Sequence, residues 1–416
     1  MISDIAIKAQ RIRHALGNLR RTTFPKDGEE IGGCNLVFGP YRCEEGFRIV
    51  EFDVTVFDPG QNYNYSKLYF STEPGHKFDE SKVLCFRVIK KDETESIRVL
   101  LPENAISSGF ILLRIDILPY SKGTAHVDNV RFLPTNDASP ASQRARRMAL
   151  KNWTRAQVEE SEAMGRGLLP HQPESLSLEL TAGCNLTCPH CSSHGTAEEH
   201  RKNNRLQAFD QNMLDHLAAS TFPSLTLLNL VGRGEPMMVA LPLWNRLIEH
   251  LSEHDVLITC VTNGTFIKQR LTSELLPLID TLTFSIDGMS DDVFSRNRGG
   301  LRLSKFMDNL SSYNEQRRSA HLARTPKLGL SWTLMRNNIH QFPDFARLAI
   351  KLEADLLYVR HLFVFHEKDR SESLISSPDI CNRYLKEGYD ILRGYPIKLD
   401  AIPLSETRKD NTHEIS

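Results

Sequence analysis

The hydrophobic positions in the first third of the chain change from a helical to a strand period. Between residues 5 and 22, apolar side chains recur at helical spacing among basic ones, which predicts an amphipathic N-terminal helix over residues 1–24. From Phe47 to Phe57 apolar and polar residues alternate, as in a half-buried strand. Short strands with no helix between them predict an antiparallel, jelly-roll-like β-sandwich over residues 25–134. Further strand-like runs lie at 67–71, 83–88, 97–101, 110–118 and 125–132.

After a linker and a helix over residues 135–170, strand and helix patterns alternate. Such alternation predicts a parallel sheet curved into a partial (β/α)6 barrel over residues 171–366, with a linker-like tail over 367–416. Functional sites in such sheets form at the C-terminal ends of the strands. The expected strands are 176–180, 225–231, 256–261, 281–286, 327–334 and 355–365, and the expected helices are 211–219, 242–252, 266–276, 303–318 and 341–352.

The charge balance and the cysteines narrow the class of protein. The 416 residues carry a net charge of -1, which gives no electrostatic case for binding nucleic acid or an anionic membrane. No apolar run reaches the ~20 residues that span a bilayer, and charged residues interrupt the N-terminus at once, so no membrane segment or secretory signal is expected. Eight cysteines, three of them clustered, do not resemble a disulfide framework. We therefore expect a cytoplasmic protein.

Three cysteines within eight positions carry the most specific chemistry. Cys184, Cys188 and Cys191 follow the first strand of the second region, and no fourth cysteine is nearby. Three thiolates can hold a cubane iron–sulfur cluster and leave one iron open to a small molecule. Zinc is the competing ligand, because a Cys3His site could be completed by His190, His194 or His200.

The cysteine spacing resembles that of the radical S-adenosylmethionine (SAM) enzymes. The likeness extends to Gly232-Arg233-Gly234-Glu235-Pro236 after the second strand, where the family has Gly-Gly-Glu-Pro, although Arg233 is inserted here between the two glycines. It also extends to Thr262-Asn263-Gly264 after the third strand and Ser285-Ile286-Asp287-Gly288 after the fourth. The chain is similar to the SPASM-type members of this family, but without their C-terminal auxiliary-cluster domain.

This resemblance implies the cofactors, a 4Fe–4S cluster held by Cys184, Cys188 and Cys191 and one molecule of SAM, together with a set of SAM contacts. Arg298 is expected to pair with the SAM carboxylate, with Arg296 as the alternative, and Leu334 to lie against adenine. No catalytic residue is named. The complete set of expected SAM contacts is His190, Gly234, Glu235, Pro236, Asn263, Ser285, Asp287, Arg298 and Leu334.

The resemblance also implies the activity. Reductive cleavage of SAM at the cluster would give a 5′-deoxyadenosyl radical, which abstracts a hydrogen atom from a glycan, nucleotide-sugar or peptide substrate. A flavodoxin- or ferredoxin-type partner would supply the electron. Residues 123–132 resemble the last strand of carbohydrate-binding modules, which would favour the sugar substrates. The alternatives are a zinc-stabilised binding protein and a degenerate cluster-binding scaffold without turnover.

Overall fold

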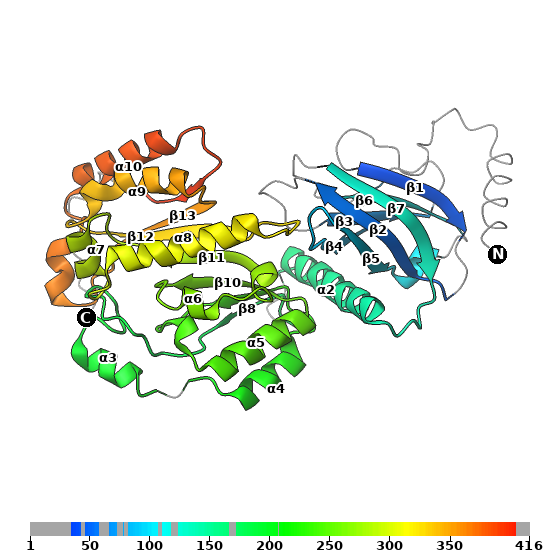
Figure 1. Cartoon of the computed structure of the whole chain (residues 1–416), viewed down its shortest axis with the longest axis horizontal. Helices are drawn as coiled ribbons and strands as arrows, with labels where there is room; N and C mark the ends of the chain where they lie inside the picture. The colour runs from blue at the N-terminus through cyan, green and yellow to red at the C-terminus, as the bar shows by residue number, and fades with distance from the viewer. Residues whose placement is uncertain are drawn as a thin grey trace. The chain divides into compact units, whose positions relative to one another are not determined.

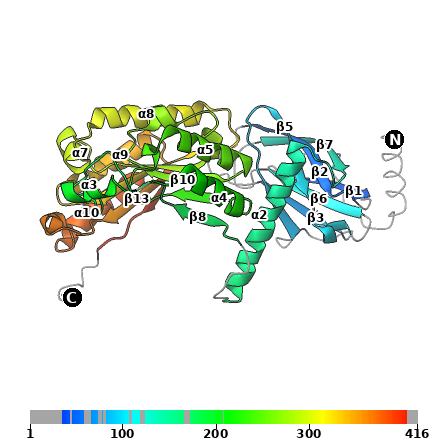
Figure 2. The same cartoon turned by 90° about the horizontal axis from the view of Figure 1, so that it is seen from below.

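The chain folds into two compact units. The computed structural model describes residues 35–42, 46–57, 66–72, 78, 82–106, 110–117, 124–165, 172–206 and 208–404, so the helix expected over residues 1–24 lies outside the described residues. One unit comprises Met1–Glu174 together with His321–Thr325, and the other comprises Ser175–Ala320 and Pro326–Ser416 (Figures 1 and 2). The second unit is therefore interrupted by a five-residue segment that belongs to the first.

The first unit contains the expected antiparallel sandwich. One sheet has the order β1-β6-β3-β4 and the other β5-β2-β7, and all the pairings are antiparallel. Alternate residues of β2, such as Val54 and Val56, are fully buried between the sheets, and Phe52 contacts Phe86 edge to face at 5.3 Å. The strands are β1 Asn35–Arg42, β2 Ile49–Phe57, β3 Ser66–Ser71, β4 Val83–Phe86, β5 Thr94–Leu100, β6 Phe110–Asp116 and β7 Thr124–Leu133, with the 3-10 turn η2 Glu103–Ile106.

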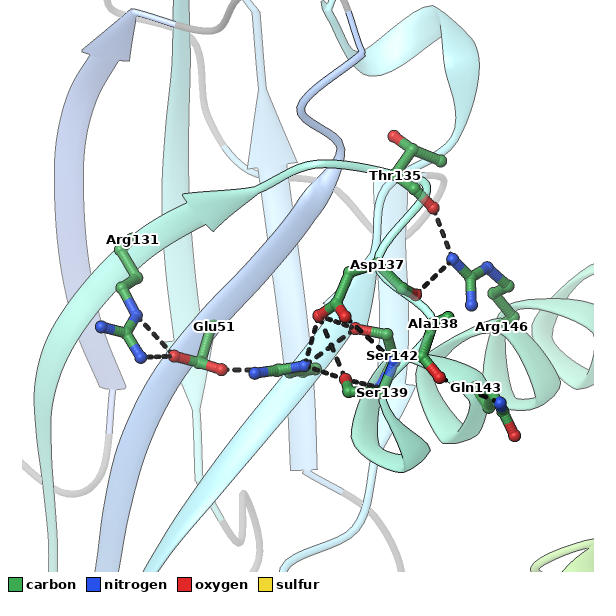
Figure 3. Close-up of polar contacts among 10 residues, drawn as sticks. Glu51, Arg131, Thr135, Asp137, Ala138, Ser139, Ser142, Gln143 and Arg146 are labelled. Atoms are coloured by element: carbon green, nitrogen blue, oxygen red, sulfur yellow. Dashed lines mark hydrogen bonds and ion pairs between the residues drawn. The ribbon is translucent and has the colours of Figure 1, made fainter.

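A buried carboxylate on β2 ties the linker to the sandwich (Figure 3). Glu51 is 3% exposed and pairs with Arg98 of β5 and Arg131 of β7. Arg98 also donates to the Asp137 carboxylate at 2.6 Å and to the Ser142 hydroxyl at 3.0 Å. Asp137 precedes helix α2 (Pro140–Ala163), and Ser142 lies in its first turn. One carboxylate thus links three strands to the segment that leaves the sandwich.

We expect Glu51→Gln to lower the free energy of unfolding of the sandwich by about 3 kcal/mol, because two arginines lose their shared buried counter-charge. Chemical denaturation measures the effect. Glu103→Gln is the matched control, since Glu103 is 90% exposed and pairs with Arg48 at 3.6 Å. Exposed pairs contribute about 1 kcal/mol or less. Equal effects of the two substitutions would contradict the assignment of a structural role to the Glu51 cluster.

The connection between helix α8 (Leu303–Ser319) and strand β12 (Lys327–Leu334) adds a short segment to the sandwich. Lys90 and Leu322 form an antiparallel bridge, the Lys91 amide donates to the His321 carbonyl at 3.0 Å, and the Ala323 amide donates to the Ile89 carbonyl at 2.8 Å. Ala323 is fully buried in the sandwich core. Residues His321–Thr325 therefore complete an edge of the first unit.

The second unit contains a parallel sheet of seven strands in the order β14-β13-β12-β11-β10-β9-β8. This confirms the expected barrel-like α/β architecture and adds one strand to it. The strands are β8 Ser175–Leu178, β9 Leu227–Leu230, β10 Leu257–Thr262, β11 Ile279–Ser285, β12 Lys327–Leu334, β13 Leu356–His361 and β14 Lys398–Asp400. The helices are α3 Ala197–Asn203, α4 Gln211–Thr221, α5 Leu241–Glu253, α6 Ile267–Arg270, α7 Asp291–Asn297, α8 Leu303–Ser319, α9 Phe342–Lys351 and α10 Pro378–Leu392, with the 3-10 turns η3 Pro236–Met238, η4 Leu276–Leu278, η5 Ile339–Gln341 and η6 Glu367–Glu372.

The two faces of this sheet differ in chemistry. On the helix side, Phe284 of β11 packs against Phe306 of α8 at 6.1 Å, and Trp332 of β12 packs against Phe345 of α9 at 4.7 Å. Because side chains alternate along a strand, Ser285, Ser331 and Thr333 lie on the opposite face, where all three are half-buried. The Ser331 hydroxyl donates to that of Ser285 at 3.2 Å. The face away from the helices is therefore polar at the C-terminal ends of β11 and β12.

The expected linker-like tail over residues 367–416 is wrong in its first part. Helix α10 packs against α9, where Gly388 lies directly against the Phe342 ring, and β14 pairs in parallel with β13. Arg360 of β13 donates to the Asp400 carboxylate of β14 at 2.6 Å. The sequence signal was weak because β14 has only three residues, too few to show a period. Within the described residues, no helix is long and apolar enough to cross a membrane.

Candidate functional site

The three clustered cysteines lie on the loop that follows β8, at the C-terminal end of the strand. Backbone amides point at two of the sulfurs, with Leu186 donating to Cys184 Sγ at 3.5 Å and Ser193 donating to Cys191 Sγ at 3.4 Å. The loop is closed by the Cys191 amide, which donates to the Cys188 carbonyl at 3.0 Å. Amide donors to sulfur are typical of loops that hold iron–sulfur clusters.

The thiols are largely shielded from water. Cys188 is buried, and Cys184 and Cys191 are half-buried. Burial raises the pKa of the Cys184 thiol to about 11 and also raises the pKa of Cys188. Buried thiols become thiolates when a positive charge offsets the lost hydration, and bound iron provides such a charge.

A side-chain network behind the loop holds Cys184 in place. The Asn204 side chain accepts the Cys184 amide at 2.9 Å and donates to the Cys184 carbonyl at 3.2 Å. His200 contacts Asn204 at 3.0 Å and the ring of His194 at 3.1 Å, and the other ring nitrogen of His194 contacts the Ala182 carbonyl at 2.9 Å. Both histidines thus use both ring nitrogens within the protein. A Cys3His zinc site completed by His194 or His200 is not supported.

The turn after β9 packs directly against the cysteine loop. A Cβ atom at Gly234 would lie 2.2 Å from the Gly183 carbonyl oxygen and 2.4 Å from that of Thr181. The Glu235 amide donates to the same Gly183 carbonyl at 2.8 Å, and Pro236 begins the buried turn η3. Because only a hydrogen atom fits at Gly234, the backbones of the two loops are in contact.

Glu235 connects this turn to the next strand end. Its carboxylate is 3% exposed and accepts the Thr262 hydroxyl at 2.7 Å, the Asn263 amide at 2.7 Å and the Met237 amide at 3.3 Å. Burial raises its pKa, and these hydrogen bonds oppose that shift. The contacts make Glu235 a positioning residue between the turns after β9 and β10.

Asn263 reaches back to the cysteine loop from the end of β10. Its side-chain nitrogen lies 3.8 Å from Cys184 Sγ and donates to the Asn185 side-chain oxygen at 2.9 Å. Its own oxygen accepts the Thr265 amide at 3.0 Å. The structure therefore brings Asn263, expected as a SAM contact, to the first cysteine.

A buried ion pair lies on the other side of the loop. Arg298 donates to the Asp287 carboxylate at 3.0 Å, and the other oxygen of Asp287 accepts the Thr333 amide at 2.7 Å. His190 lies with Nε2 3.5 Å from Asp287, and burial lowers the pKa of this histidine. Burial alone would lower the pKa of Arg298, but the negative charges of Cys188 and Asp287 outweigh it and raise the pKa. Arg298 therefore remains a cation beside the thiols.

Two polar atoms at this ion pair lack a hydrogen-bond partner among the described residues. They are Arg298 Nε and His190 Nδ1, and both are buried. Gly299, with φ at +58°, brings the chain so close that a Cβ would lie 2.6 Å from the Thr187 amide nitrogen. Three loop thiols with unsatisfied polar groups beside them fit a 4Fe–4S cluster and a small polar molecule next to it.

Leu334, which is expected to lie against adenine, is on the side of the sheet that faces the helices. Leu334 is 1% exposed and, by the alternation along β12, lies on the same side as Trp332, which packs on α9. The inward position next to it is Thr333. Ser285, in contrast, lies on the polar inner face. Sequence reasoning assigned no role to Asn204, Thr262 or Thr333. Thr262 stands in the Thr262-Asn263-Gly264 motif, whereas Asn204 and Thr333 stand in no recognisable motif.

The comparisons with known proteins agree with this geometry. A profile of the Radical SAM superfamily matches residues 178–324, which include the cysteine loop and Arg298. The tungsten-containing aldehyde ferredoxin oxidoreductase cofactor-modifying protein of Pyrococcus furiosus is 25% identical over 45% of this chain and 51% of its own length.

Two further relatives are similar over comparable stretches. The mycofactocin maturase MftC of Mycolicibacterium smegmatis is 28% identical over 48% of this chain and 47% of its own length. The PqqA peptide cyclase of Bradyrhizobium diazoefficiens is 25% identical over 53% of this chain and 56% of its own length. The chain thus spans about half the length of the curated relatives it matches. The cysteine loop and the profile match over residues 178–324 thus support a radical SAM domain in this chain, and the cofactors of that superfamily are a 4Fe–4S cluster and S-adenosylmethionine.

Proposed function

We propose that this chain is a radical SAM enzyme that modifies a peptide. The observation that carries the enzymatic part is the convergence of the cysteine loop, the Glu235 turn and the Arg298–Asp287 pair at one edge of the sheet. The peptide substrate is supported by the PqqA peptide cyclase among the relatives, which favours a peptide over a glycan.

In this proposal the protein binds and orients, and the cofactors react. When bound, the cluster and SAM supply the reductive cleavage that gives a hydrogen-abstracting 5′-deoxyadenosyl radical. Cys184, Cys188 and Cys191 would hold the cluster. Arg298, through its unpartnered Nε, would offer a donor to the SAM carboxylate, while Asp287 fixes the guanidinium. A flavodoxin- or ferredoxin-type protein would supply the electron.

The remaining expected SAM contacts have separate roles in this proposal. Gly234 and Pro236 would shape the turn that faces SAM, and Asn263 and Ser285 would present polar atoms to it. His190, neutral because it is buried, would offer the unpartnered Nδ1. We assign Leu334 no SAM contact in this proposal, because it lies on the side of the sheet that faces the helices.

The surface after β13 suits a peptide side chain. Phe363 and Phe365 are 77% and 58% exposed, and their rings stack with centroids 5.8 Å apart. They follow the C-terminal end of β13, the edge of the sheet at which the cysteine loop lies. Exposed aromatic pairs of this kind commonly anchor apolar side chains of a binding partner.

The test begins with the chain purified and reconstituted under anaerobic conditions. With dithionite and SAM we expect 5′-deoxyadenosine, measured by chromatography, and none from Cys188→Ala. Incubation with short peptides in deuterated form should then transfer deuterium into 5′-deoxyadenosine. A brown protein that forms no 5′-deoxyadenosine would support the scaffold alternative. A colourless protein whose loop cysteines hold zinc would support the binding-protein alternative.

A further inference from the structure

A second cluster of metal-ligand side chains lies at the opposite end of the sheet from the cysteine loop. His250 and Glu253 lie in the last turn of α5 and His254 is the C-cap of this helix, and their ligand atoms lie within 4.8 Å of one another. Residues spaced three and four apart on a helix share one face. The turn precedes β10, so the cluster lies at the N-terminal ends of the strands, away from the SAM site.

A carboxylate on the neighbouring helix orients the His250 ring. Asp215 of α4 lies 2.6 Å from His250 Nε2 and also accepts Arg246 Nε at 2.8 Å. The Asp215 carboxylate therefore accepts hydrogen bonds from both residues. A carboxylate that accepts Nε2–H leaves the lone pair of a neutral imidazole on Nδ1, which is how carboxylate–histidine–metal triads orient their ligand.

The other ring nitrogen of His250 is unsatisfied. The side chain is 9% exposed, and Nδ1 is buried with no hydrogen-bond partner among the described residues. Its nearest charged neighbour is Glu253 Oε2 at 3.7 Å, too far for a hydrogen bond. A buried imidazole nitrogen that faces a carboxylate without contact leaves room for a bridging ion.

An aromatic wall holds both imidazoles. Phe222, at the end of α4, is fully buried and contacts the rings of His250 and His254 edge to face, at 6.4 and 6.2 Å. This wall keeps one side of the cluster apolar. Glu253 is exposed and His254 half-buried, so both can adjust to a ligand geometry that the rigid His250 sets.

We propose that His250, Glu253 and His254 form a binding site for a divalent transition metal ion of the Zn²⁺ class. Two imidazole nitrogens and one carboxylate oxygen are the ligand types that Zn²⁺ takes, and water would complete a tetrahedral shell. Asp215 would act as a positioning residue through His250. The ion would join α4 and α5 through this residue and would stabilise the barrel unit.

Isothermal titration with Zn²⁺ tests the proposal on the full chain with its iron–sulfur cluster reconstituted, so that the loop cysteines are occupied. We expect one Zn²⁺ per chain and a rise in the melting temperature with Zn²⁺ concentration, because binding to the native state alone stabilises it. Both effects should disappear in His254→Ala and in Glu253→Gln, whose exposed side chain is not needed for folding. Asp215→Asn should weaken binding by about 10- to 100-fold.

His216→Ala is the matched control, because His216 is an exposed histidine beside Asp215 and does not belong to the cluster. It should bind Zn²⁺ as the unaltered chain does. Two results would overturn the proposal. One is the absence of Zn²⁺ binding, which would leave His250 as a structural hydrogen-bond partner of Asp215. The other is equal binding by the unaltered chain and both ligand variants, which would place the zinc elsewhere.

Discussion

Gly234→Ala should remove most of the SAM cleavage activity without replacing a cysteine that would hold the cluster. The added Cβ would lie 2.2 Å from the Gly183 carbonyl oxygen. Its three nearest atoms all belong to the backbone, which cannot rotate away as a side chain can. The turn must therefore move away from the cysteine loop and lose the Glu235–Gly183 hydrogen bond of 2.8 Å. A displacement of about 1 Å in a catalytic constellation reduces rates by about 100-fold. Formation of 5′-deoxyadenosine and the iron content per chain measure the loss.

Gly300→Ala provides the control for this prediction. Gly300 has φ at +84°, but no atom lies within 4 Å of a Cβ built there. The substitution should therefore destabilise the fold by about 1–2 kcal/mol through backbone conformation alone and leave the iron content unchanged. If Gly234→Ala keeps full iron content and activity, the close contact between the two loops is required neither for cluster binding nor for SAM cleavage.

Arg298→Met should have the second large effect, on both stability and SAM binding. Removing the guanidinium leaves Asp287 as a buried carboxylate without its cation, which destabilises a protein by about 3–5 kcal/mol. Binding of SAM, followed by equilibrium dialysis, should weaken because the expected partner of its carboxylate is lost. Thermal unfolding reports the first effect separately from the second.

The double variant Arg298→Met with Asp287→Asn separates the two roles. Neutralising Asp287 should recover much of the stability, because no unpaired charge remains buried. SAM affinity should stay low if Arg298 contacts SAM directly. Arg296→Met is the companion control, since Arg296 is exposed on α7, and its SAM affinity should equal that of the unaltered chain. Normal affinity in the double variant would reduce Arg298 to a structural residue.

The fold was largely predictable where the hydrophobic period was long. The alternation of apolar and polar residues in β2 predicted the sandwich, and the alternation of strand and helix patterns after Leu176 predicted the barrel-like unit. Strand β1 was missed because Gly39-Pro40 interrupts its pattern, which the structure accommodates by a register shift between Phe38 and Tyr41. The helix expected over residues 266–276 ends at Arg270, since Leu271 is already extended. Short elements such as β14 form because a neighbouring strand offers partners, which a local pattern cannot reveal.

Only those residues of the site that stand in recognisable sequence motifs could be predicted. Cysteine spacing and the order of the motifs along the strands gave Cys184, Glu235 and Arg298. The contacts between these residues were not predictable, because they depend on atoms brought together from different loops. Leu334 shows the limit most clearly, since a residue at a strand end can face either side, and only the packing of Trp332 on α9 decides which.

Residues His321–Thr325 lie within the sequence of the barrel unit but belong to the sandwich unit. This affects the order in which the chain can fold during its synthesis. Domains at the N-terminus normally fold while the ribosome is still translating the rest, at about 5–20 residues per second. Here the core position of Ala323 and the edge partner Leu322 are made almost 150 residues after Glu174, the last residue of the first unit's main segment. In the nascent chain, the sandwich edge that pairs with Leu322 therefore stays unpaired until the residues that follow α8 have left the ribosome.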